Sequence, residues 1–326
     1  EWQIVPSYQI EGTFIPFTFS YRKVGVASAL YYLRVLPTWI SLYPVRVALN
    51  TIDAFQPALT LASGGYVSAP ALIASIIRGV PIALLELNAV PGKVNSLFAP
   101  NAIRIFCVME PPVKSFRKRA APGSVKMVGF IKRRFKEGTP DYFHLTEKPL
   151  VVISGGSIGA ERINHVFLRS AQDARFAQKF SELAFLHQWG RVPREQEYGR
   201  LILLQNYKAI AFDPMLPSIY PNAILYIGRA GAATLCDLAS ASLPSVLIPY
   251  PHHRDKQQYK NAEYLAEKGC ARIVDEKSFL PEVFESLLEE LVLQKGAEKL
   301  RKNFDKLKKD GASTVAREIV SLLEES

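Results

Sequence analysis

Three glycine-containing turns in the second half of the sequence carry the residues best suited to bind phosphate or sugar groups. The first, Gly155–Ala160, follows an apolar run at 149–154 and precedes a helical pattern that starts near Ala160. Its glycines let a ligand approach the backbone, and the helix offers unsatisfied N–H groups and the positive end of its dipole. Ser157 adds a hydroxyl donor. This turn therefore predicts a phosphate site, with an ordinary tight turn as the alternative.

The second and third turns add groups that could recognise a nucleotide, a sugar or a base. In the second, Gly228–Asp237, the acid lies in the early turns of the expected helix. There Asp237 can reach a ribose hydroxyl, or it can simply interact favourably with the helix dipole. The third turn, at 249–261, is rich in basic and amide side chains. Gln257 and Gln258 suit recognition of a sugar or base, because each amide both donates and accepts hydrogen bonds.

Short apolar runs, glycine or proline turns and helical segments alternate along the chain and must position these residues. We expect strands at 58–62, 81–85, 103–109, 149–154, 223–227 and 245–249. This alternation is typical of parallel βαβ units, and an α+β fold with antiparallel pairs is the alternative. The carboxyl ends of parallel strands meet at one sheet edge, so the three turns are expected to converge there. GxGxxG and GxxxxGK[ST] are absent, which disfavours a dinucleotide cofactor and a P-loop ATPase.

Composition limits the classes of protein that the chain can form. Its 326 residues are 48% hydrophobic and 21% charged, which predicts a soluble globular protein of two domains. We place a boundary within 137–148, where glycine and proline interrupt the pattern.

Three widely spaced cysteines without CxxC indicate a reducing compartment and no thiolate metal site. Adjacent His252 and His253 cannot easily share one metal and lack a third partner, so no metal is expected.

The net charge of +10 directs attention to an anionic partner. Residues 111–136 hold nine Lys or Arg and no acid, which predicts either a solvated basic face or a surface for anionic lipid. Nucleic acid is not expected, because no RNA- or DNA-binding motif occurs.

The apolar stretch 29–50 is interrupted by charges and prolines and is not expected to span a membrane. Its aromatic and basic residues suit a membrane surface or an aromatic core helix. No signal peptide is visible.

Several motifs resemble those of a known family, the peptidoglycan N-acetylglucosaminyltransferases usually called MurG. The matching stretches are Gly64–Pro70, Glu86–Asn88 with Pro91–Asn95, Gly155–Ala160, Gly228–Gly231 and Asp255–Ala262. The resemblance implies the GT-B fold, in which two Rossmann-like parallel-sheet α/β domains face each other across a cleft. Residues 1–140 would form an acceptor-binding, membrane-facing domain whose first βα unit is missing. Residues 141–326 would form the UDP-sugar donor domain with a C-terminal helix.

The same resemblance implies an activity and its partners. The family transfers N-acetylglucosamine from UDP-GlcNAc, with inversion, to the C4 hydroxyl of the muramyl sugar on undecaprenyl diphosphate. This step converts lipid I into lipid II in peptidoglycan synthesis, and so serves cell-wall biogenesis, cell shape and cell division. No metal or other cofactor is implied, and the absence of Asp-x-Asp agrees with that. The expected location is peripheral, on the anionic cytoplasmic face of the bacterial inner membrane.

Residue roles follow from the motif matches. UDP-GlcNAc would be bound by Asn88, Arg133, Ser157, Phe212, Ala233, Thr234, Asp237, Gln257 and Gln258. Among these, Arg133 and Ser157 would hold the diphosphate, and the backbone of Phe212 would contact uracil. The acceptor would be bound by Gly65, Tyr66, Ser68 and Asn95, and Glu86 is the candidate base.

The sequence also departs from the family pattern. The family's glycine-rich GGTGGH loop is absent, which predicts an N-terminally incomplete chain. The family's His-Glu-x-Asn reads Leu85–Asn88, its Gly-Asn-Pro-x-Arg reads Gly129–Arg133, and its ribose-binding Glu is Asp237. Two alternatives therefore stay open. One is a related GT-B transferase with another UDP-sugar or lipid acceptor, such as diacylglycerol, and the other is a degenerate, non-catalytic UDP-sugar-binding protein.

Overall fold

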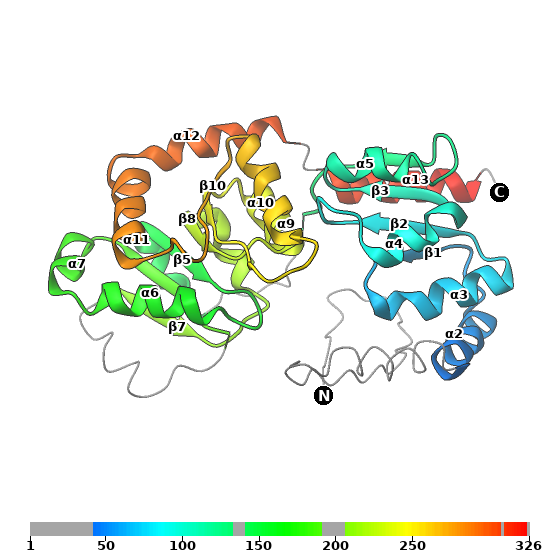
Figure 1. Ribbon diagram of the computed structural model, residues 1–326, viewed down its shortest axis with the longest axis horizontal. Helices are drawn as coiled ribbons and strands as arrows, with labels where there is room; N and C mark the ends of the chain where they lie inside the picture. The colour runs from blue at the N-terminus through cyan, green and yellow to red at the C-terminus, as the bar shows by residue number, and fades with distance from the viewer. Residues whose placement is uncertain (1–41, 133–140, 191–205, 308–309, 325–326) are drawn as a thin grey trace. The chain divides into compact units, whose positions relative to one another are not determined.

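A computed structural model describes residues 42–132, 141–190, 206–307 and 310–324 (Figure 1). The chain divides into two compact units. Among the described residues, the first comprises 42–87, 91–128 and 314–324, and the second comprises 88–90, 129–132, 141–190, 206–307 and 310–313. The sequence had suggested a division at 140/141 and a C-terminal helix in the second domain. The structure groups that helix with the first unit, where Glu318 pairs with Lys126 at 2.5 Å and with Arg104 at 3.7 Å.

Within the described residues, the first unit contains a four-stranded sheet in the order β1-β2-β3-β4, with every strand pair parallel. Its strands are β1 (Thr60–Ala62), β2 (Ile82–Glu86), β3 (Ala102–Cys107) and β4 (Val125–Met127). Its helices are α2 (Leu42–Phe55), α3 (Ala69–Arg78), α4 (Lys93–Phe98), α5 (Pro111–Phe116) and α13 (Gly311–Glu324), with short turns η1 (Tyr66–Ser68) and η2 (Ala99–Asn101). The buried side chains of Leu72, Leu84, Ile105 and Phe116 belong to its core.

Helix α3 shows how the local sequence sets these elements. Pro70 occupies the first turn, where its missing N–H costs nothing, and Gly79 ends the helix with a left-handed φ of 69°. Ala74 on one face of α3 packs against Ala48 and Ile52 of α2. Other α3 side chains, including Ile77, stay exposed.

In the part of the second unit that the structure describes, six strands form a sheet in the order β10-β9-β8-β5-β6-β7, and every pair of neighbours is parallel. Its strands are β5 (Leu150–Ser154), β6 (Ala184–Gln188), β7 (Tyr207–Ile210), β8 (Ala223–Gly228), β9 (Ser245–Leu247) and β10 (Ala271–Ile273). Its helices are α6 (Glu161–Ala171), α7 (Ala174–Lys179), α9 (Ala232–Ala241), α10 (Gln257–Glu267), α11 (Pro281–Leu288) and α12 (Gly296–Asn303). The shorter turns are η3 (Phe143–Glu147), η4 (Leu216–Asn222), η5 (Glu289–Leu293) and η6 (Phe304–Lys306).

The strand order of the second unit determines where a ligand would bind. All five residues of β5 are buried, as expected for a central parallel strand covered on both faces. From β5 the chain builds β6 and β7 on one side and β8, β9 and β10 on the other. The order therefore reverses between β5 and β8, and open α/β sheets bind ligands outside the carboxyl ends of strands at such a point. The predicted parallel α/β fold with two sheets is confirmed.

Candidate functional site

The turn between β5 and α6 is built for close approach of a ligand. Gly156 and Gly159 have positive φ values of 82° and 80°. A Cβ on Gly155 would lie 2.2 Å from the Ala160 amide nitrogen, so only glycine fits there. Helix α6 begins without a side-chain cap, which leaves its first N–H groups for another acceptor. Ser157 is exposed at this turn, and a side chain that binds a phosphate group must be accessible.

The turn between β8 and α9 lies across the switch point from that one. Helix α9 also begins without a side-chain cap, after Gly231. Ala233 is exposed and Thr234 is half-buried, while Asp237 is 7% exposed. The first turn of α9 contains no acid, so Asp237 lies beyond the region where the helix dipole acts strongly. A favourable interaction with the helix dipole therefore does not by itself explain why an acid occupies position 237.

Helix α10 begins after the third turn, and its first residues fold back on the preceding loop. Lys256 has a left-handed φ of 49°, and the Gln257 amide donates to an Asp255 carboxylate oxygen at 3.2 Å. The side-chain oxygen of Gln258 accepts a hydrogen bond from the Tyr250 amide at 3.0 Å. Gln258 is therefore oriented by the loop that precedes its helix.

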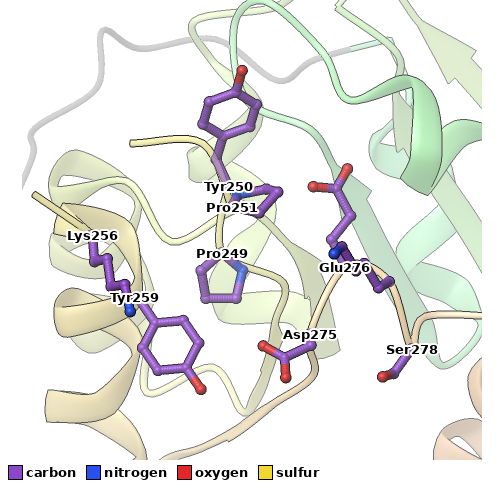
Figure 2. Close-up of a pocket in the computed structure, with 9 residues that line it drawn as sticks. Pro249, Tyr250, Pro251, Lys256, Tyr259, Asp275, Glu276 and Ser278 are labelled. Atoms are coloured by element: carbon purple, nitrogen blue, oxygen red, sulfur yellow. The ribbon is translucent and has the colours of Figure 1, made fainter. Parts of the chain in front are cut away.

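A cavity of about 370 Å³ adjoins the beginning of α10 (Figure 2). It is lined by Pro249, Tyr250, Pro251, Lys256, Tyr259, Asp275, Glu276, Lys277 and Ser278. Arg229 lies beside it and donates to the Ile248 carbonyl at 3.0 Å and to Glu276 at 2.9 Å, with its guanidinium 5.5 Å from the Tyr250 ring centre. The cavity contains none of the predicted site residues. Its lining residues Lys256 and Tyr259 flank Gln257 and Gln258 in sequence, and the other lining residues follow β9 and β10.

Asn261 was not among the predicted site residues, although it lies within a quoted motif. Its side chain on α10 is 1% exposed and makes three hydrogen bonds within the second unit. Its nitrogen donates to the Asn88 side-chain oxygen and to the Ala230 carbonyl, each at 3.2 Å, and its oxygen accepts from the Ala89 amide at 2.8 Å. The predicted donor-binding residue Asn88 is thus fixed beside the turn that follows β8.

The predicted base-binding residue Phe212 follows β7 and is 53% exposed. Gln188 holds the loop that follows β7, because its side-chain oxygen accepts a hydrogen bond from the Asp213 amide at 3.1 Å. Neither Gln188 nor Asp213 was predicted as a site residue. The other polar residue of β6, His187, is fully buried, and burial lowers its pKa to about 3. Its Nε2 lies 3.0 Å from the Asn164 side-chain oxygen, so it belongs to the core beneath α6.

The predicted acceptor residues lie together in the first unit. Asn95 is 1% exposed and donates to the Leu85 carbonyl at 3.2 Å and to Glu86 at 3.0 Å. A Cβ on Gly64 would lie 3.0 Å from the Asn95 side-chain nitrogen, so the amide packs directly against that glycine. The exposed residues Gly65 and Tyr66 follow, and Ser68 donates to the Gly65 carbonyl at 2.8 Å.

Glu86 occupies a different setting from that of an open catalytic base. It ends β2 and is 2% exposed, and one carboxylate oxygen accepts from the Gly92 amide at 2.7 Å and from Asn95. These bonds hold Gly92, which precedes α4, and the Asn95 side chain on that helix. The role of Glu86 as base stays a prediction.

The remaining predictions concern the diphosphate-binding residue Arg133, metal sites and the membrane. Arg133 lies outside the described residues. Within 42–132, 141–190, 206–307 and 310–324, no group of three or more His, Cys, Asp or Glu side chains is placed to hold a metal ion. In the same part of the chain, no helix is both long and apolar enough to cross a bilayer.

Comparisons with known proteins agree with this geometry. Residues 1–107 match the glycosyltransferase family 28 N-terminal domain, and residues 150–316 match the family's C-terminal domain. The chain is 31% identical over 296 residues to the UDP-N-acetylglucosamine–N-acetylmuramyl-(pentapeptide) pyrophosphoryl-undecaprenol N-acetylglucosamine transferase of Haemophilus influenzae, covering 89% of this chain and 78% of that protein. It is 31% identical to the Haemophilus ducreyi enzyme of the same name, covering 99% and 88%.

A solved structure shows the same fold. The crystal structure of Acinetobacter baumannii MurG matches with a TM-score of 0.65 and 22% identity, covering 94% of this chain and 82% of that one. The fold is therefore GT-B, as the motifs implied. With both family 28 domains matched and relatives at 31% identity over most of its length, this chain belongs to the MurG family of glycosyltransferases.

Proposed function

We propose that this chain transfers N-acetylglucosamine from UDP-GlcNAc to the C4 hydroxyl of the muramyl sugar on undecaprenyl diphosphate, with inversion at the anomeric carbon. The observation that carries the proposal is the position of two uncapped helix N-termini, those of α6 and α9, after the adjacent strands β5 and β8. The product would feed peptidoglycan synthesis, on which cell shape and division depend. The names of the relatives support the choice of donor and acceptor.

The chemistry is a direct displacement. The acceptor oxygen forms a bond to the anomeric carbon as the bond to the UDP oxygen breaks, and the hydroxyl proton passes to a base. Negative charge grows on the departing diphosphate, so groups that stabilise it selectively in the transition state accelerate the reaction. The N–H groups that begin α6 and α9, with the Ser157 hydroxyl, supply that stabilisation without a metal. Arg133 would add a cation to the same diphosphate.

Donor recognition is assigned to residues around those helices. Asp237 accepts hydrogen bonds from the ribose hydroxyls, and its burial strengthens that interaction by excluding water. The side-chain oxygen of Gln258 already accepts from Tyr250, so its amide N–H groups meet the sugar hydroxyls. Gln257, Thr234 and Ala233 contact the sugar and phosphate end.

The acceptor belongs to the first unit, where Gly65, Tyr66 and Ser68 border the buried amide of Asn95. The same unit exposes apolar side chains around α2, β1, η1, α3 and α4: Phe55, Leu61, Tyr66, Val67, Ile76, Ile77 and Leu97. It also exposes a basic group on α5 and the turn that follows: Lys114, Arg117, Lys118 and Arg119. We assign these surfaces to peripheral binding at the anionic cytoplasmic face of the inner membrane, where the lipid acceptor resides.

The test of the donor site is a calorimetric titration of the chain with UDP-GlcNAc, UDP-GalNAc and UDP-glucose, with EDTA present throughout. We expect selective, metal-independent binding of UDP-GlcNAc that Asp237→Asn weakens. The matched control is Asp305→Asn, which changes an exposed acid of the same unit. Failure to bind any of the three sugars would contradict the proposal.

Transfer is then measured with radiolabelled UDP-GlcNAc and a short-chain lipid I analogue, with diacylglycerol as the competing acceptor. Labelled lipid II analogue is the expected product. Transfer to diacylglycerol alone would identify the related transferase, and selective binding without any transfer would identify the non-catalytic UDP-sugar-binding protein.

A further inference from the structure

Gln188 joins two parts of the donor site that are distant in sequence. It is the last residue of β6, it is 4% exposed, and it lies between β5 and β7 at the carboxyl edge of the sheet. Its side-chain nitrogen donates to the Ser154 hydroxyl at 3.1 Å and to the Gly156 carbonyl at 3.3 Å. Its side-chain oxygen accepts from the Asp213 amide at 3.1 Å. One amide group thus connects the turn after β5 with the loop after β7.

The loop after β7 is braced on its other side as well. The Asp213 carboxylate accepts from the Met215 amide at 2.7 Å and from the Tyr142 hydroxyl at 2.8 Å. Tyr142 is 1% exposed, and burial together with the neighbouring Asp213 raises its pKa, so the hydroxyl stays a donor. The Ala211 carbonyl accepts from the Gly190 amide at 2.6 Å. The backbone on both sides of Phe212 is therefore fixed, while the Phe212 side chain is half-exposed.

The bond from Asp213 to Gln188 also fixes a carbonyl. The Asp213 N–H and the Phe212 C=O belong to the same planar trans peptide unit, so they point in opposite directions. Because the N–H is directed at the Gln188 side-chain oxygen, the Phe212 carbonyl is directed away from it. Rotation of this peptide would break the partly buried hydrogen bond to Gln188.

The direction of that carbonyl matters for base recognition. Uracil presents an N3–H donor beside the O4 acceptor, whereas cytosine presents an N3 acceptor beside the N4 amino donor. A fixed backbone carbonyl can accept from uracil N3–H but would face a lone pair on cytosine N3. A peptide free to rotate would lose that discrimination.

We propose that Gln188 is a positioning residue that sets uridine specificity by fixing the orientation of the Phe212–Asp213 peptide. This inference rests on the proposed UDP-GlcNAc site and adds a residue that does not itself touch the ligand. The two ends of the Gln188 amide have separate tasks. Its oxygen controls the base-binding peptide, and its nitrogen supports the phosphate turn through Ser154 and Gly156.

The experiment compares two substitutions that separate these tasks. Gln188→Met keeps the length of the side chain but removes both ends of the amide. Gln188→Glu keeps an acceptor for the Asp213 amide but removes the donors to Ser154 and Gly156. Gln178→Met, on the exposed face of α7, is the matched control. Dissociation constants for UDP and CDP are measured by calorimetry on each full chain, with thermal unfolding recorded alongside.

For Gln188→Met we expect the preference for UDP over CDP to fall about tenfold, the effect of roughly one hydrogen bond. For Gln188→Glu we expect weaker binding of both nucleotides with the UDP preference retained. The control keeps the affinities and the preference of the unsubstituted chain.

Two results would overturn the inference, and they differ from failure of the proposed function. If the unsubstituted chain prefers UDP and Gln188→Met keeps that preference, the side chain has only a structural role, even where the unfolding temperature drops. If both Gln188 variants lose the preference equally, the oxygen of the amide is not the controlling group. If the unsubstituted chain binds UDP no better than CDP, the proposed donor site itself is wrong.

Discussion

Arg229 and Glu276 form a largely buried ion pair that joins the turn after β8 to the loop after β10, with side-chain exposures of 9% and 17%. Although Arg229 lies in a turn of the proposed donor site, its guanidinium is used for this internal contact and for the Ile248 carbonyl. The pair thus braces the loop that contains Tyr250, which in turn orients Gln258.

Removing the cation of this pair should destabilise the second unit. In Arg229→Met, Glu276 would keep a mostly buried charge without its partner, and we expect a loss of about 3 kcal/mol in the free energy of unfolding. Adding Glu276→Leu should restore part of that loss, because no lone charge is then left buried. Urea unfolding followed by tryptophan fluorescence measures both variants. Equal stability of the single and double variants would contradict this account.

Substitution of Gly159 should damage both folding and phosphate binding. A Cβ there would lie 2.0 Å from the Trp189 carbonyl oxygen, and φ is 80°. Gly123 has a similar φ of 78° but nothing within 4 Å of its Cβ, so Gly123→Ala measures the backbone cost alone. We expect about 1 kcal/mol for Gly123→Ala and about 2 kcal/mol more for Gly159→Ala. Chemical denaturation gives both values, and calorimetry with UDP should show weakened binding only for Gly159→Ala.

The burial of His187 predicts a dependence of stability on pH. Its folded pKa of about 3 lies below the unfolded value of 6.5, so the unfolded chain binds the extra proton. Stability is therefore complete above pH 6.5 and falls as the pH drops toward 3. Between pH 7 and 5.5 we expect a loss of about 1 kcal/mol. In His187→Gln, which has no titrating ring, the loss over this interval should shrink, and an unchanged pH slope would rule out His187 as its source.

Glu86→Gln separates a catalytic base from a residue that holds its neighbours. Glutamine keeps an oxygen for the Gly92 amide but cannot take a proton near neutral pH. Because Glu86 is buried and bonded to Asn95, we expect kcat to fall less than about tenfold and KM for the lipid acceptor to rise. Loss of a general base would lower kcat by roughly 100-fold or more and remove a limb of the pH–rate profile. Steady-state kinetics from pH 6 to about 9 distinguish these outcomes.

Membrane binding should depend on the apolar surface of α3. Ile77 is 56% exposed, and Ile77→Glu should reduce binding to vesicles of anionic phospholipid by about tenfold, the effect of losing one inserted apolar side chain. Val320→Glu on α13, where Val320 is 53% exposed, is the matched control. Co-sedimentation at increasing salt measures both variants. Binding that is equally sensitive to the two changes, or insensitive to salt, would place the membrane surface elsewhere.

The turns of the proposed donor site could be located from the sequence, because each is specified by residues that are adjacent in the chain. Glycine between an apolar run and a helix marks Gly155–Ala160 and Gly228–Gly231 with no knowledge of the partners. Gln188 was missed because it ends an apolar strand and its partners, Ser154 and Asp213, are 34 and 25 residues away. Such contacts exist only once the strand order is known.

The burial of Glu86 and its hydrogen-bond partners also could not be predicted from the sequence. Glu86 lies two residues before Asn88 in a family-like motif, which suggested a catalytic base. The burial of Glu86, however, depends on how α4 packs beside β2. The roles of the predicted site residues stay predictions, while the positions of all of them except Arg133 are now described.

The return of α13 to the first unit has a consequence for how the protein is made. Strands β1–β4 are synthesised before the second unit, yet Lys126 and Arg104 can meet Glu318 only after α13 has been synthesised. The second unit, nearly continuous in sequence, has all its strands emerged before then. The first unit is therefore completed only after the second, and removing α13 would leave Lys126 and Arg104 without Glu318.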